Sequence, residues 1–127
     1  ITKDAKGLRF KNAYFSISVL ESMCAALSPY IGKEVIMGIR PEDIYDKLFA
    51  QNASDKYVVK ARVEVVEPMG SEIYLYLNAA RSESQPSLEF VARVRSDDTA
   101  SPNQELECVF DMNKAHFFDV ETEKTIC

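Results

Sequence analysis

An alternation of apolar side chains with a period of two, broken once by a turn, constrains the fold of this chain more than any other feature of its sequence. Residues 57–67 and 72–79 both alternate in this way, as the two faces of a β-strand require. Residues 68–71, Pro-Met-Gly-Ser, favour a turn between the two runs. The pattern predicts a β-hairpin whose first strand has an apolar face formed by Val59, Ala61, Val63 and Val65.

Shorter strands are predicted along the rest of the second half. Apolar alternation indicates strands at 88–95 and 105–110, and a final strand pair at 116–119 and 125–126. Polar loops separate the predicted elements at 51–56, 82–87 and 97–103. About five short strands at nearly regular spacing are typical of a small barrel or sandwich, and an OB-type barrel fits them best.

The first half is expected to add a small sheet and one helix. Strands are predicted at 8–10, 14–19 and 34–39, and one helical turn within 44–49. A helix of about three turns, running from Leu20 towards Leu27 and ending at Ser28-Pro29, is also predicted. Its apolar stripe consists of Leu20, Met23, Cys24, Leu27 and Ile31. The fold class is therefore mainly β: an OB-like β barrel with a small additional β sheet and one short helix.

Composition and charge exclude several classes of protein. With 127 residues, 46% of them hydrophobic and 28% charged, the chain has the proportions of one globular domain. Its net charge of −5 disfavours nucleic acid, whose phosphates attract basic surfaces. No apolar run approaches the ~20 residues that span a bilayer, so direct membrane insertion is not expected. Three cysteines, an odd number spread far apart, argue against a disulfide framework or a zinc cluster.

The residues that catalysis requires are scarce. His116 is the single histidine, and no serine or cysteine motif places a nucleophile beside it. The four glycines form no phosphate-binding loop, and Asp97-Asp98 lacks the further ligands of a calcium loop. We therefore expect no catalytic, cofactor-binding or metal-binding residue in this chain. The aromatic residues Tyr74, Tyr76 and Phe90 could instead form a stacking platform, or they could simply pack within the hairpin and core.

Four segments, read in order, carry a resemblance to a known family. They are YIGKEVIMGIRPEDI at 30–44, VEVVEPMGSE at 63–72, FVARV at 90–94, and HFFD at 116–119 with residues 122–126. Together they resemble the C-terminal TOBE-type region of ATP-binding subunits of ABC importers. The similarity is greatest to the carbohydrate branch, of the maltose and multiple-sugar type.

This resemblance implies a fold and a domain organisation, and it implies that a second domain lies outside this sequence. The fold would be a TOBE/MOP-like OB barrel, and residues 1–127 would be a single C-terminal regulatory domain. The chain begins with Ile1 rather than Met and lacks the Walker motifs, so a nucleotide-binding domain is expected upstream. ATP and Mg²⁺ would then be cofactors of the full-length ATPase and not of this fragment. The chain alone would not be an enzyme.

The resemblance also implies partners and a location. A second copy of the ATPase subunit would form a homodimer through this region, and membrane permease subunits would bind through the missing domain. In some members of the family the region also binds cytosolic regulators, for which loops 81–87 and 97–103 are candidate surfaces. The protein would lie in the cytoplasm, peripheral to the inner face of the cell membrane. In relatives that handle oxyanions similar domains bind the anion, so a sugar- or oxyanion-binding OB module is the alternative function.

Several residues within the matching segments are candidates for a subunit interface or a regulatory contact. They are Arg40, Pro41, Glu42, Asp43, Gly70, Ser71, Glu72 and His116. One interpretation is that Arg40 and Glu42 fix a turn and orient loops towards the other subunit. The other is that they only close the fold locally. Gly70 and Ser71 would permit the tight turn of the predicted hairpin.

Overall fold

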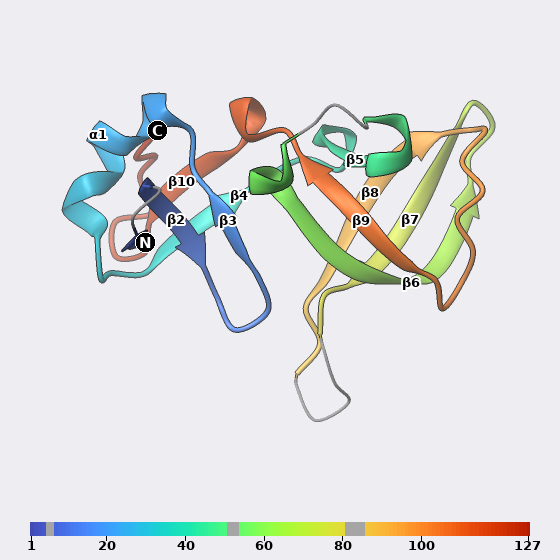
Figure 1. The fold of residues 1–127 in the computed structure, drawn as a ribbon, viewed down its shortest axis with the longest axis horizontal. Helices are drawn as coiled ribbons and strands as arrows, with labels where there is room; N and C mark the ends of the chain where they lie inside the picture. The colour runs from blue at the N-terminus through green and yellow to red at the C-terminus, as the bar shows by residue number, and fades with distance from the viewer. Residues whose placement is uncertain (5–6, 51–53, 81–85) are drawn as a thin grey trace.

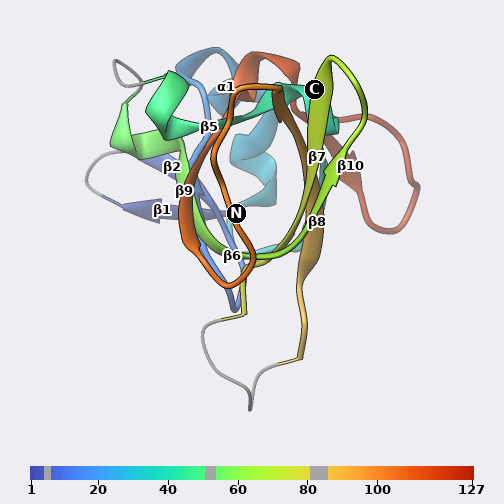
Figure 2. The same ribbon diagram turned by 90° about the vertical axis from the view of Figure 1, so that its right-hand side faces the viewer.

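A five-stranded antiparallel sheet, curled into a nearly closed barrel, forms one half of the molecule (Figure 1). The computed structural model describes residues 1–4, 7–50, 54–80 and 86–127. The strand order is β5-β9-β6-β7-β8, with β5 (Ile44–Asp46), β6 (Val58–Pro68), β7 (Glu72–Asn78), β8 (Glu89–Arg95) and β9 (Glu105–Phe110). The two edge strands, β5 and β8, lie beside each other, and Figure 2 shows how the sheet curves to bring them together. The predicted mainly β, OB-like architecture is confirmed.

The other half, which we call the two-sheet region, contains two small antiparallel sheets and the helical segment. One sheet has the order β1-β2-β3, with β1 (Thr2–Asp4), β2 (Gly7–Lys11) and β3 (Ser16–Ser18). The other pairs β4 (Val35–Gly38) with β10 (His116–Asp119), so it joins the first and last parts of the chain. No helix in the described ranges is long and apolar enough to cross a membrane.

The predicted helix is present as a mixed helical segment. It consists of the 3₁₀ turn η1 (Glu21–Met23), the short α-helix α1 (Cys24–Leu27) and the 3₁₀ turn η2 (Ser28–Tyr30). Pro29 does not end it, because a proline in the first turn of a helix needs no backbone donor. Only Leu27 of the predicted apolar stripe is fully buried, and Ile31 at its end is exposed.

Two further sequence predictions are corrected by strand pairing. Within 44–49 the predicted helical turn covers only η4 (Lys47–Phe49), because Ile44–Asp46 pairs with β9 as β5. The final strand pair is reduced to one bridge between Phe118 and Thr125, and β10 pairs mainly with β4 instead. The loops predicted at 51–56 and 82–87 lie partly outside the described residues. Where the first is described, Asp55–Tyr57 forms the 3₁₀ turn η5.

A β-bulge in β6 overturns one predicted face. The pairing passes from Val63↔Leu77 directly to Val65↔Tyr76, so Glu64 is an extra residue with no residue opposite it on β7. An extra residue inverts the alternation beyond it. Val63 is therefore buried as predicted, but Val65 points outwards and is 51% exposed, and Val66 packs against the core in its place.

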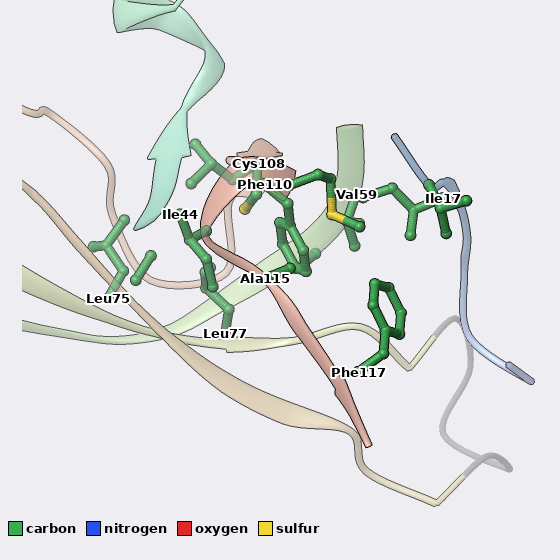
Figure 3. Packing of buried hydrophobic residues seen from close by; sticks show 14 of the residues in the cluster. Ile17, Ile44, Val59, Leu75, Leu77, Cys108, Phe110, Ala115 and Phe117 are labelled. Carbon is green, nitrogen blue, oxygen red and sulfur yellow. The ribbon is translucent and has the colours of Figure 1, made fainter. Parts of the chain in front are cut away.

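One hydrophobic core extends through both halves (Figure 3). Five phenylalanine rings follow one another across it, and we call them the phenylalanine row. In order they are Phe117, Phe10, Phe15, Phe110 and Phe90, with successive ring centroids 5.9, 6.1, 6.0 and 5.7 Å apart. These separations are typical of tilted and edge-to-face aromatic contacts. The row therefore joins β10 and β2 of the two-sheet region to β9 and β8 of the barrel.

Candidate binding groove

A groove of about 480 Å³ lies on the barrel, where β8 meets the segments before and after β5. We call it the Arg93 groove. It is lined by Glu42, Tyr45, Asp46, Phe49, Ser71, Glu72, Arg93, Val94 and Arg95. These residues come from three separate segments of the sequence, which the curvature of the sheet brings together (Figure 2).

Two tight turns position the acidic side of the groove. The 3₁₀ turn η3 (Pro41–Asp43) starts with a proline whose fixed φ suits it, and the Asp43 N–H donates to the Arg40 carbonyl over 3.0 Å. The turn between β6 and β7 contains Gly70 at φ +78°, a conformation that glycine adopts without strain. These turns place Glu42 and Glu72 on the same groove.

Arg93 is the electrostatic centre of the groove. Its Nε lies 2.6 Å from Oε2 of Glu72. A hydrogen bond with Tyr74 and the charges of Glu72 and Glu42 raise the pKa of Arg93 above its ordinary value. Because Arg93 and Glu72 are both partly exposed, the ion pair fixes their geometry more than it stabilises the fold.

The opposite side of the groove is aromatic. The guanidinium of Arg95 lies 4.5 Å from the centre of the Phe49 ring and also pairs with Asp97 at 2.8 Å. Phe49 and Tyr45 form its exposed apolar rim. Partial burial, together with the charges of Asp111 and Asp43, raises the pKa of Tyr45. The groove thus combines arginines with aromatic side chains, two residue types that are enriched at protein interfaces.

The structure gathers most of the candidate residues predicted from the sequence into this area. Glu42, Ser71 and Glu72 line the groove, and Pro41, Asp43 and Gly70 belong to the turns that position them. Arg40 is exposed, and its side chain forms no ion pair among the described residues. His116 is exposed at the start of β10, opposite Gly38, and does not line the groove.

Sequence reasoning missed the aromatic and basic residues of the groove. Arg93 and Arg95 alternate with the apolar residues of their strand, a signal that places them on its outer face but not at a site. Tyr45 and Asp46 were expected in a helical turn, which hid the strand alternation that exposes Tyr45 and buries Asp46.

The suggested aromatic platform does not form. Tyr76 pairs with Val91 and Tyr74 with Arg93, whereas Phe90 pairs with the buried Leu77 on the other face of the sheet. Phe90 contacts the Phe110 ring in the core. The alternative, that these side chains pack within the hairpin and core, holds for Phe90.

A larger hollow, of about 950 Å³, lies along β6 and β9 and includes none of the candidate residues. Its charged side chains partly neutralise one another, because Lys47 pairs with Asp55 at 2.6 Å and with Glu107 at 3.5 Å. Within the described ranges, no three metal-ligating side chains come together here or elsewhere. The Arg93 groove is therefore the stronger candidate site.

A family model and several curated relatives agree on the family of this chain. A family model described as the TOBE domain matches residues 37–118. The chain is similar to the oligosaccharides import ATP-binding protein MsmX of Bacillus subtilis, with 45% identity over 97 residues that make up 76% of this chain. It is 43% identical over 98 residues to the trehalose/maltose import ATP-binding protein MalK of Thermococcus litoralis, again over 76% of this chain.

A third relative matches more of the chain. The multiple sugar-binding transport ATP-binding protein MsmK of Streptococcus mutans is 38% identical over 113 residues, or 87% of this chain. The chain spans only about a quarter of the length of these curated relatives: 25%, 25% and 28%.

Proposed function

Because the chain belongs to the TOBE domain family, we propose that it is the C-terminal regulatory domain of the ATP-binding subunit of a sugar importer. The observation that carries this proposal is the 45% identity, over three quarters of the chain, to a protein named for oligosaccharide import. Two further relatives named for sugar transport support the same class of substrate.

In this proposal the chain contributes regulation and not chemistry. ATP and Mg²⁺ bind in another part of the full-length protein, which hydrolyses ATP at the cytoplasmic face of the membrane together with permease subunits. The sequence supports this division, because it contains no phosphate-binding loop.

The Arg93 groove serves as the contact surface for a second copy of the subunit or for a cytosolic regulator. Its apolar rim is exposed, while its charged groups are held in place by ion pairs. A rigid patch of this kind loses little conformational entropy on binding. A contact at the groove couples the partner to the ATPase through the barrel.

A matched pair of variants tests the proposal. Phe49→Asp places a charge on the groove rim, where Phe49 is 39% exposed, and Val65→Asp places the same charge on the bulged strand outside the groove, where Val65 is 51% exposed. We expect Phe49→Asp to weaken association of the full-length subunit about tenfold and to lower its sugar-stimulated ATPase activity. Sedimentation velocity and an ATPase assay in vesicles with the permease measure the two effects. Equal behaviour of both variants and the parent protein would contradict a role for the groove.

The alternative function is binding of a sugar or an oxyanion in the same groove. Its support is the presence of two arginines beside aromatic side chains. However, Glu72 and Asp97 already pair with these arginines, so an anion would have to displace a carboxylate. Thermal unfolding in maltose, phosphate and sulfate distinguishes the two functions. A ligand-specific rise in Tm that Arg93→Ala abolishes would favour the alternative.

A further inference from the structure

Two buried carboxyl groups face each other where the barrel closes. Asp46 ends β5 and Asp98 lies in the loop between β8 and β9, and their side chains are within hydrogen-bond reach of each other. They are only 3% and 8% exposed. The pair therefore joins the edge strand β5 to the loop that follows the opposite edge strand.

Each carboxyl group has one oxygen satisfied and one oxygen left over. Oδ1 of Asp46 accepts from the Leu48 N–H at 3.0 Å, and Oδ1 of Asp98 accepts from the Ala100 N–H at 2.8 Å. Oδ2 of each is fully buried and has no donor among the described residues. A buried acceptor without a donor is costly, and two facing carboxylates also repel each other.

No cation in the described structure compensates the pair. The basic side chains of the adjoining elements are engaged elsewhere: Lys47 with Asp55 and Glu107, Arg93 with Glu72, and Arg95 with Asp97 and the Phe49 ring. From β9 the pair is faced by the thiol of Cys108, opposite Asp46 in the ladder. Burial and the two carboxyl groups raise the pKa of this thiol to about 12, which keeps it neutral. Glu42, on the groove that Asp46 also lines, adds negative charge.

We propose that Asp46 and Asp98 share one proton, which bridges their two Oδ2 atoms and fastens the closing seam of the barrel. A single proton supplies the missing donor and removes the repulsion at once, as in other carboxyl pairs buried at short range. Loss of the proton leaves two facing charges in the interior, which loosens the contact between β5 and the β8–β9 loop. The inference is independent of the proposed role in transport.

The direction of the pH effect follows from the environment. Burial, followed by the hydrogen bond with Asp98, raises the pKa of Asp46 from 3.8 to about 6. A carboxyl group that holds its proton more tightly in the folded state stabilises the fold below its unfolded pKa. It loses that contribution as pH rises through the window from about 4 to about 6. This rise in the pKa of Asp46 on folding corresponds to about a hundredfold change in the folding equilibrium constant.

Asp46→Asn tests the bridge directly. The amide oxygen can keep the bond from the Leu48 N–H, while the amide nitrogen becomes a permanent donor to Asp98. We expect the variant to be more stable than the parent chain at pH 7 and about equal at pH 4. Because other carboxyl groups also titrate, the measured quantity is the difference between variant and parent across the pH series, obtained by urea unfolding. Asp98→Asn should behave in the same way.

Asp97→Asn is the matched control, because Asp97 is the exposed neighbour of Asp98 and pairs with Arg95 instead. It should leave the pH profile between 4 and 7 parallel to that of the parent. Carboxyl ¹³C NMR of the parent chain provides a readout that does not depend on any variant. A resonance of the pair titrating near pH 6 supports the bridge. Ordinary titration of both groups near pH 4, or Asp46→Asn and Asp97→Asn profiles that coincide, would overturn it.

Discussion

Two aspartates, one in each half of the molecule, show how differently the barrel and the two-sheet region use the same side chain. Asp119 at the end of β10 accepts from the Glu121 and Thr122 N–H groups at 2.8 and 3.0 Å and from the Tyr30 hydroxyl at 2.8 Å. These bonds lower its pKa. Asp46 in the barrel is buried with one oxygen unsatisfied, and its pKa is raised. Burial therefore makes one carboxyl group resist ionisation, while hydrogen-bond donors make the other stabilise a turn as a carboxylate.

Deleting a ring from the shared core is expected to have the largest effect and tests whether the two halves are separable. Phe117 is fully buried on β10 and contacts Phe10 in the phenylalanine row. Phe117→Ala should cost about 3–5 kcal/mol of unfolding free energy. Circular dichroism and tyrosine fluorescence during urea unfolding should show one transition at a lower midpoint. Two separated transitions would mean that the barrel folds without the two-sheet region.

Removing a buried amide is expected to have the next largest effect, and it acts on the barrel alone. Asn78 is 5% exposed, donates to Glu64 at the bulge over 2.9 Å and accepts from the Ala80 N–H over 2.9 Å. Asn78→Ala removes both hydrogen bonds and should lower the free energy of unfolding by about 1–3 kcal/mol. Chemical denaturation measures the loss, and hydrogen exchange should locate it in β6 and β7. Protection lost first in β2 and β3 would contradict this localisation.

A surface contact of the barrel should contribute much less. Arg95 lies over the Phe49 ring but is largely exposed. Arg95→Ala should cost about 0.5–1 kcal/mol, the usual value for an exposed cation–π pair. Arg95→Lys should retain part of this, because a lysine keeps the charge. A loss above about 2 kcal/mol by thermal unfolding would show that Arg95 supports the seam more directly than its exposure suggests.

The smallest effect at neutral pH is expected for Asp119→Asn, and its pH dependence sharpens the contrast with Asp46. The amide oxygen still accepts backbone bonds, so the turn should persist. Because the folded pKa of Asp119 is lowered, its charge stabilises the fold above the unfolded pKa and ceases to do so as pH falls. The variant should therefore be slightly less stable than the parent at pH 7 and equally stable near pH 2. An equal difference at both values would contradict the assignment.

The sequence predicted those parts of the fold that depend on local alternation. The strands at 57–67 and 72–79 match β6 and β7 closely, because a turn between two alternating runs determines both pairing and faces. The bulge at Glu64 was missed because one extra residue inverts a face without any change in composition. β5 was missed because three residues are too few to establish a period, and only its pairing with β9 defines it.

The candidate site was predictable only in part, for a related reason. Glu42, Ser71 and Glu72 belong to segments with a family resemblance, and the structure brings them to one groove. Arg93 joins them only because β8 lies beside η3 in the curved sheet, a proximity that no local pattern encodes. The aspartate pair requires the same closure, since its members are far apart in the sequence.

The strand order also has a consequence for synthesis. β5 leaves the ribosome before every other strand of the barrel, yet its ladder partner is β9, the last one made. β4 is synthesised before β5 and pairs with β10, which is synthesised after β9. Until β9 and β10 have been synthesised, β5 and β4 lack their strand partners and stay exposed to misassociation. Late, long-range pairing of this kind makes folding slow and favours assistance by chaperones during synthesis.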